Sequence, residues 1–129
     1  MGILTTQIVA CLFGFTGILL GAFGAHVLKE KFTPEQMASF ETGVKYQMYH
    51  AIVLLVLSFN LGFTEKLENT VTLFFALGTL LFSFSIYGLC FSAASGGKWK
   101  WLGPITPLGG LFLAGGWGLL LFLFIENIF

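Results

Sequence analysis

The chain contains four long apolar stretches, and its charged residues lie almost entirely in the connections between them. Each stretch has about the length, roughly 20 residues, that an α-helix needs to cross the hydrocarbon core of a bilayer. The chain is 57% hydrophobic and only 9% charged, whereas soluble domains carry about 25% charged residues. We therefore predict an all-α polytopic membrane protein, a four-helix bundle that forms one integral membrane domain over residues 1–129. The predicted spans are about residues 3–28, 46–63, 70–91 and 106–125.

The first apolar stretch begins at the N-terminus without any basic residue. Met1 to Ala25 contains no Lys or Arg and is longer than the apolar core of a signal peptide. We therefore expect a spanning helix that is retained rather than a leader that is removed.

The segment before the second span is amphipathic, unlike the spans themselves. Thr33 suits a helix cap, Pro34 suits the first turn, and Gln36 completes a capping box. From Pro34 to about Lys45, apolar residues favour one side of the helix and charged residues the other. We expect an amphipathic helical portion at the membrane surface, which either continues into the second span or bends near Gly43.

Small residues are spaced regularly in the first and fourth stretches, which favours close helix packing. In the first stretch, a seam from Ala10 to Gly24 has alternating spacings of four and three, typical of a left-handed crossing. In the fourth, small residues recur every four positions, typical of a right-handed crossing. The helix-packing residues predicted from the two seams are Gly14, Gly17, Gly21, Gly110, Ala114 and Gly118.

The third stretch carries a polar stripe that runs from Thr72 through Thr79 and Ser83 to Tyr87. Ser and Thr hydroxyls in membrane helices often bond to a carbonyl one turn back in the same helix. They also bond across to neighbouring helices, at about 0.6 kcal/mol each. The spacing leaves both alternatives open.

Polar residues of all four spans lie toward the ends that meet the first and third connections. A histidine, an amide or a phenol is costly to expose to lipid, so each needs a partner at the same depth. We predict one hydrogen-bonded cluster in the cytoplasmic leaflet, which serves either the packing of the bundle alone or a ligand, ion or partner. The predicted cluster consists of His26, Tyr46, Gln47, His50, Ser83, Tyr87 and Thr106.

The lysines indicate the orientation of the chain. Those in the first and third connections are Lys29, Lys31, Lys45, Lys98 and Lys100, and only Lys66 falls in the second. Because positively charged loops stay in the cytoplasm, we predict a multi-pass inner-membrane protein with both termini on the non-cytoplasmic side. Trp residues alternate with Lys in the third connection, as is typical of an anchor at the membrane interface.

Four short motifs resemble those of one known family. They are Gly21–His26 (GAFGAH), Tyr46–Ala51 (YQMYHA), Phe82–Tyr87 (FSFSIY) and Ile105–Gly110 (ITPLGG), in that order. With them the chain resembles, over nearly its whole length, the family called domain of unknown function 423. The resemblance implies a four-helix inner-membrane protein and no established activity. The family commonly has glycine where this chain has Phe84, which implies altered packing near the predicted cluster.

Composition and motifs argue against several functional classes. The net charge is zero and the chain contains no Arg, so we expect no nucleic-acid partner. We expect no enzyme activity, because no nucleophile–base pair, phosphate loop or carboxylate pair is recognisable. Cys11 and Cys90 lie in apolar stretches, and we interpret them as small buried hydrophobes rather than a disulfide or ligand pair. No metal site and no cofactor are predicted.

Three functional hypotheses fit the sequence. The main prediction is a non-catalytic binding or accessory subunit that contacts the lipid bilayer and either itself or a larger membrane complex. The alternative is an oligomeric small-solute transporter or channel, in which His26 or His50 would titrate because no span carries a carboxylate. A third hypothesis is a haem or metal ion held by these two histidines, although two histidines alone make a poor zinc site.

Overall fold

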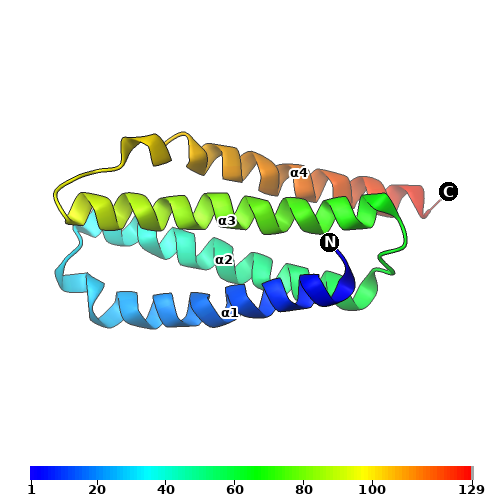
Figure 1. The fold of residues 1–129 in the computed structure, drawn as a ribbon, viewed down its shortest axis with the longest axis horizontal. Helices are drawn as coiled ribbons and strands as arrows, with labels where there is room; N and C mark the ends of the chain where they lie inside the picture. Colours follow the sequence, from blue (N-terminus) through cyan, green and yellow to red (C-terminus); the bar gives the residue numbers. More distant parts are fainter. Residues whose placement is uncertain (129) are drawn as a thin grey trace.

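The apolar stretches form helices that end where the polar connections begin. The computed structural model describes residues 1–128, in which four long helices and two short 3-10 helices follow one another. The long helices run alternately up and down, so both termini and the α2–α3 connection lie at one end of the bundle (Figure 1). The other end, called here the lysine-bearing end, holds the connections that contain Lys29, Lys31, Lys98 and Lys100. The elements are α1 (Ile3–His26), η1 (Leu28–Glu30), α2 (Pro34–Asn60), α3 (Lys66–Ala94), η2 (Lys100–Leu102) and α4 (Ile105–Glu126).

The all-α four-helix membrane bundle predicted from the sequence is confirmed. Within residues 1–128, three helical segments are long and apolar enough to cross a membrane: Ile3–His26, Lys66–Ala94 and Lys100–Glu126. α2 is long enough, with 27 residues, but it is more polar because it carries Gln47 and His50 near its middle. Both of these side chains are buried by the neighbouring helices, which is how a more polar helix is accommodated in such a bundle.

α2 begins at the predicted capping box. The Gln36 N–H donates to Oγ1 of Thr33 at 3.2 Å, and the Thr33 N–H donates to Oε1 of Gln36 at 3.0 Å. The helix then runs without a break from Pro34 to Asn60, so the amphipathic portion and the second span are one helix. Gly43 lies inside it at a close approach to α3, since a Cβ there would be 2.8 Å from Cε1 of Tyr87.

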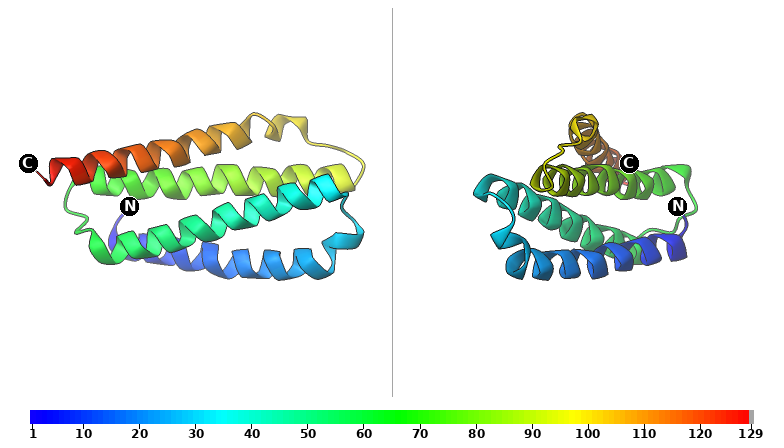
Figure 2. Two further views of the ribbon diagram at one scale, coloured as in Figure 1. Left: turned by 180° about the vertical axis from the view of Figure 1, so that it is seen from behind. Right: turned by 60° about the vertical axis from the view of Figure 1, so that its left-hand side comes forward.

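Helix packing follows the order of the chain. Within residues 1–128, extensive contacts join α1 to α2, α2 to α3 and α3 to α4, and α3 lies between α4 and the α1–α2 pair (Figures 1 and 2). α1 and α4 therefore each pack closely on one neighbour and turn large apolar side chains such as Leu4, Phe15 and Leu121 outward. In a membrane these outward faces meet lipid, which matches their chemistry.

The seam of α1 packs most closely on α2 at two positions that are seven residues apart. A Cβ on Gly17 would lie 2.7 Å from Sδ of Met48, and one on Gly24 would lie 2.6 Å from Cε1 of Phe40. The intervening predicted positions are looser: a Cβ on Gly21 would make an ordinary contact at 3.4 Å, and one on Gly14 would have nothing within 4 Å. The closest contacts thus lie at Gly17 and Gly24.

The seam predicted for α4 needs correction, because within residues 1–128 it makes no close packing contact with another helix, and of its two glycines only Gly110 comes within ordinary contact distance of α3. A Cβ on Gly118 would have nothing within 4 Å, the nearest atom to one on Gly110 would be 3.9 Å away, and Ala114 is exposed. α4 instead meets α3 through Gly109, where a Cβ would be 2.7 Å from the Cα of Phe82. Glycines in α4 occur on more than one face, so spacing by four did not single out the face that packs.

The apolar core has two parts. The larger part lies toward the termini and includes Phe13, Leu54 and Phe75. The smaller part lies at the lysine-bearing end and includes Phe40 and Tyr87. Polar side chains of α2 and α3 lie between the two parts.

Candidate functional site

Gln47 is fully buried in the middle of α2 and joins three helices. Its Nε2 donates to the carbonyl oxygen of Phe13 and to Oγ1 of Thr16 on α1, both at 2.8 Å. Its Oε1 accepts a hydrogen bond of 2.7 Å from the hydroxyl of Tyr87 on α3. Both amide donors are therefore used, and the carbonyl has a partner. We call Gln47 with its three partners the Gln47 node.

The depth of the Gln47 node differs from the prediction. Phe13 and Thr16 lie near the middle of α1 (Ile3–His26), and Gln47 lies near the middle of α2 (Pro34–Asn60). Phe13, Thr16 and Gln47 thus lie about midway along the bundle, and Tyr87 reaches Gln47 from the lysine-bearing half of α3. A polar group at that level is the most costly to leave without a partner, because water is furthest away.

The hydroxyl groups in the polar stripe of α3 form both kinds of hydrogen bond that the sequence left open, within the helix and across to a neighbouring helix. Thr72 and Thr79 are fully buried, and their hydroxyls donate to carbonyl oxygens within α3. Ser83 instead donates across to the carbonyl oxygen of Gly43 on α2 at 2.7 Å. With Tyr87, Ser83 fixes α3 to α2 next to the Gln47 node.

Thr106 makes a separate polar contact. Its Oγ1 lies 2.7 Å from Oγ of Ser85, which links the first turn of α4 to α3. Ser85 has a single hydroxyl hydrogen and donates it to the carbonyl oxygen of Phe82 at 3.0 Å. Thr106 is therefore the donor in the contact with Ser85. The residues of the predicted cluster thus form separate groups of polar contacts rather than one connected cluster.

His50 is buried and keeps one nitrogen without a partner. Its Nδ1 lies 2.8 Å from the carbonyl oxygen of Tyr46. Because a carbonyl only accepts, Nδ1 carries the hydrogen and Nε2 holds a lone pair. Nε2 has no hydrogen-bond partner among residues 1–128. The ring packs among Tyr46, Phe75 and Trp117, at centroid distances of 6.2, 5.6 and 6.4 Å.

His26 and Tyr46, which belong to the predicted cluster, are exposed rather than buried with the Gln47 node. His26 is exposed in the last turn of α1 at the lysine-bearing end, whereas His50 lies level with Phe75, in the other half of α3 (Lys66–Ala94). The two histidines therefore do not meet. Tyr46 is 41% exposed, and its ring packs on Phe82 at 4.7 Å. Helical spacing had grouped these residues by face, but it could not show which neighbour covers each face.

The cysteines and other potential metal ligands are dispersed. Cys90 is buried as predicted, but Cys11 is exposed on α1, so the expectation that it is buried needs correction. Among the described residues, no three His, Cys, Asp or Glu side chains gather where they could hold a metal ion.

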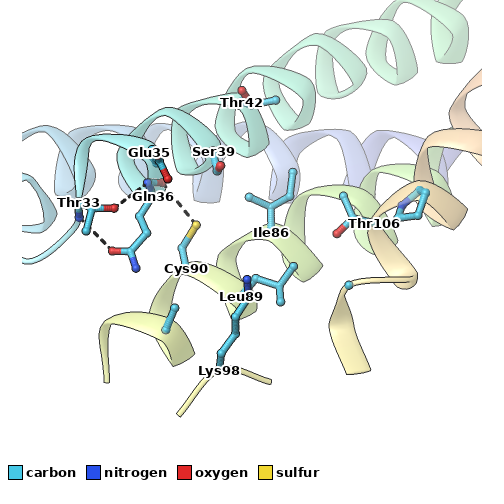
Figure 3. Close-up of a pocket in the computed structure, with 13 residues that line it drawn as sticks. Thr33, Glu35, Gln36, Ser39, Thr42, Ile86, Leu89, Cys90, Lys98 and Thr106 are labelled. Carbon is cyan, nitrogen blue, oxygen red and sulfur yellow. Dashed lines mark hydrogen bonds between the residues drawn. The ribbon is translucent and has the colours of Figure 1, made fainter. Parts of the chain in front are cut away.

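A groove opens between α2 and α4 at the lysine-bearing end (Figure 3). Its volume is about 780 Å³. Polar residues of the first turns of α2, including Glu35 and Ser39, form one wall, and Lys98 and Thr106 belong to the opposite wall. The floor is the apolar surface of α3 at Ile86 and Leu89. We call this cavity the α2–α4 groove.

Hydrogen bonds on both sides hold the walls of the α2–α4 groove in place. Sγ of Cys90 donates to the carbonyl oxygen of Gln36 at 3.4 Å, which fixes α2 to the floor (Figure 3). The bond between Thr106 and Ser85 fixes α4 to the same helix. The N–H of Trp99 donates to Oγ of Ser92 on α3 at 3.1 Å. The groove was not predicted from the sequence, because it depends on the distance between α2 and α4.

Comparison with known proteins gives a family and no activity. A sequence model of the family described as "Protein of unknown function (DUF423)" matches residues 20–110. The UPF0382 inner membrane protein YgdD of Escherichia coli (strain K12) is 35% identical over 121 residues, covering 88% of this chain and 84% of that protein. A UPF0382 membrane protein of Staphylococcus haemolyticus is 38% identical, covering 78% of this chain and 79% of its own. One from Schizosaccharomyces pombe is 33% identical, covering 88% of this chain and 95% of its own. No solved structure matches the chain significantly. By its family match and these relatives, this membrane protein belongs to the DUF423 family.

Proposed function

We propose that this protein is a non-catalytic binding or accessory subunit of the membrane, and that its ligand lies in the α2–α4 groove. The groove itself is the observation that carries the proposal. Its volume of about 780 Å³ falls within the roughly 300–1,000 Å³ of small-molecule sites. It combines an apolar floor with a few polar groups on its walls, the usual composition of such sites.

The chemistry of the groove favours binding over catalysis. Cys90 is the strongest nucleophile in its lining, and its thiol donates to a backbone carbonyl of α2 rather than to a base. A nucleophile needs an adjacent base or a lowered pKa for covalent catalysis. The partners of Gln47 are likewise engaged with one another, as expected for groups that hold helices together.

The position of the groove favours an amphiphilic ligand. Positively charged connections stay in the cytoplasm, so the lysine-bearing end faces the cytoplasm and both termini lie on the other side of the inner membrane. Trp99 and Trp101 are 56% and 66% exposed beside the groove, and indoles gather at the level of the lipid headgroups. The groove therefore lies where polar headgroups meet acyl chains.

Filling the groove tests the proposal. Ser39→Trp places a large ring in the groove, whereas Ala38→Trp places the same ring on a neighbouring exposed position of α2 that does not line it. The full chain is purified in mild detergent, and bound molecules are identified by native mass spectrometry. We expect the wild type and Ala38→Trp to retain a bound molecule that Ser39→Trp loses. Identical profiles for the two variants would contradict the proposal.

A second candidate is an oligomeric small-solute transporter or channel, which the free Nε2 of His50 favours. This lone pair is a hydrogen-bond acceptor buried in the bundle, which a solute would meet only if the helices around His50 moved apart. Flux into proteoliposomes tests the idea, with His50→Phe compared with Tyr49→Phe on the exposed face of α2. Loss of flux in His50→Phe alone would support transport. Wild-type vesicles no more permeable than protein-free vesicles would reject it.

A further inference from the structure

The two charges of the α2–α4 groove suggest the class of its ligand. We propose that the groove binds the headgroup of a zwitterionic phospholipid with a primary amine, that is, of the phosphatidylethanolamine class. This inference rests on the proposed binding function and names the ligand of the same site.

Charge complementarity is the first reason. Glu35 lines the groove from the first turn of α2, and Lys98 lines it from the connection on the opposite side (Figure 3). A zwitterionic headgroup carries a phosphate that complements Lys98 and an amine that complements Glu35. An anionic headgroup would be attracted by Lys98 but repelled by Glu35. The groove is thus matched to a ligand with one charge of each sign.

Hydrogen bonding distinguishes a primary amine from a quaternary one. A primary ammonium group has three N–H donors, and the carboxylate of Glu35 is an acceptor. Such charge-assisted hydrogen bonds are about twice as strong as neutral ones. A trimethylammonium group has no N–H to donate, so it would leave the acceptor capacity of Glu35 unused. The carboxylate therefore favours ethanolamine over choline.

The phosphate has further complementary groups on the α4 side. The lining there includes Thr106, in the first turn of α4. α4 begins after Pro104 without a side-chain cap, so the backbone N–H groups of Ile105 and Thr106 and the positive end of the helix dipole add to the charge of Lys98.

The floor of the groove suits the apolar part of a lipid. Ile86 and Leu89 of α3 form this floor. One turn further toward the middle of the bundle, Tyr46 packs on Phe82 at a centroid distance of 4.7 Å. This aromatic pair continues the apolar surface away from the charged walls. A lipid can therefore place its headgroup between Glu35 and Lys98 and its acyl chains along the bundle.

The test compares three lipids with identical acyl chains and ethanolamine, choline or glycerol headgroups. Purified full-length protein in mild detergent is titrated with each lipid, and bound lipid is counted by native mass spectrometry. We expect the ethanolamine lipid to bind best, and Glu35→Gln to reduce its advantage over the choline lipid by about tenfold. Lys98→Gln should weaken the binding of all three lipids. Glu30→Gln and Lys100→Gln, which change charges at the same end outside the groove lining, should bind like the wild type.

The outcomes separate this inference from the proposed function. Equal binding of the three lipids, unchanged by Glu35→Gln but abolished by Ser39→Trp, would overturn the ethanolamine assignment and leave a groove that binds lipid. Preference for the glycerol headgroup would overturn it as well. Binding that Ser39→Trp leaves intact would overturn both. Circular dichroism of each variant verifies that the helices are formed.

Discussion

The hydroxyl of Tyr87 donates a hydrogen bond of 2.7 Å to Oε1 of Gln47, between the two apolar parts of the core. The same amide holds α1 through Phe13 and Thr16. Three helices therefore meet at one buried side chain, at a depth where water cannot replace a lost partner.

Removing this amide should loosen all three helices. Gln47→Leu leaves the Tyr87 hydroxyl without its acceptor, and we expect the unfolding free energy to fall by about 1–3 kcal/mol. Tyr87→Phe removes the donor to Oε1 of the fully buried Gln47 and leaves that acceptor without a partner, so we expect a loss of similar size, about 1–3 kcal/mol. Unfolding in bicelles by titration with dodecyl sulfate measures both. A Gln47→Leu protein as stable as the wild type would show that the Gln47 node does not stabilise the bundle.

Glycine should be needed on only one face of α4. A Cβ at Gly109 would overlap the backbone of Phe82, which cannot move aside as a flexible side chain can. We expect Gly109→Ala to lower the unfolding free energy by about 1–3 kcal/mol, as overpacking does. Gly118→Ala adds the same atom where nothing lies within 4 Å, so its effect should stay within about 0.5 kcal/mol. Equal effects of the two substitutions would contradict the α3–α4 packing described here.

The free nitrogen of His50 should lower the stability of the isolated protein. His50→Phe keeps a ring among Phe75 and Trp117 and removes the buried acceptor. Because an unsatisfied buried acceptor costs about 1–3 kcal/mol, we expect this variant to unfold at a higher temperature in ligand-free detergent. His26→Phe, at an exposed position, is the control and should change little. A less stable His50→Phe protein would mean that Nε2 has a partner in solution.

The orientation can be tested with single cysteines in the connections. Thr64→Cys lies between α2 and α3, and Gly97→Cys lies at the lysine-bearing end, both at exposed positions. In intact cells, a membrane-impermeant maleimide should label Thr64→Cys, and it should label Gly97→Cys only after the membrane is permeabilised. The unmodified chain, whose cysteines lie within α1 and α3, gives the background. The reverse pattern would place the termini in the cytoplasm.

Much of the fold could be predicted because local chemistry determines it. The capping box fixes the start of α2 at Thr33 and Gln36, and the charged connections separate the long apolar runs. The stripe of α3 also marks a truly buried face: Thr72, Thr79 and Ser83 are all fully buried. These features depend on neighbours three or four residues apart, which a sequence displays directly.

Relationships between helices were harder to predict. Gly109 and Gly110 are adjacent in the sequence, and only the position of Phe82 decides which of them must be glycine. His26 and His50 looked equivalent by type and by distance from a connection, yet one is exposed and the other buried. The α2–α4 groove depends on how far two helices lie apart across α3, a quantity that no spacing within one helix contains.

The packing of each helix on its predecessor has a consequence for biogenesis. A helix that leaves the ribosome and enters the bilayer finds one packing partner already there, since α2 docks on α1, α3 on α2 and α4 on α3. Contacts between segments close in sequence require little loop-closure entropy and form quickly. The protein can thus assemble in the order of its synthesis, without waiting for its last segment to close the structure.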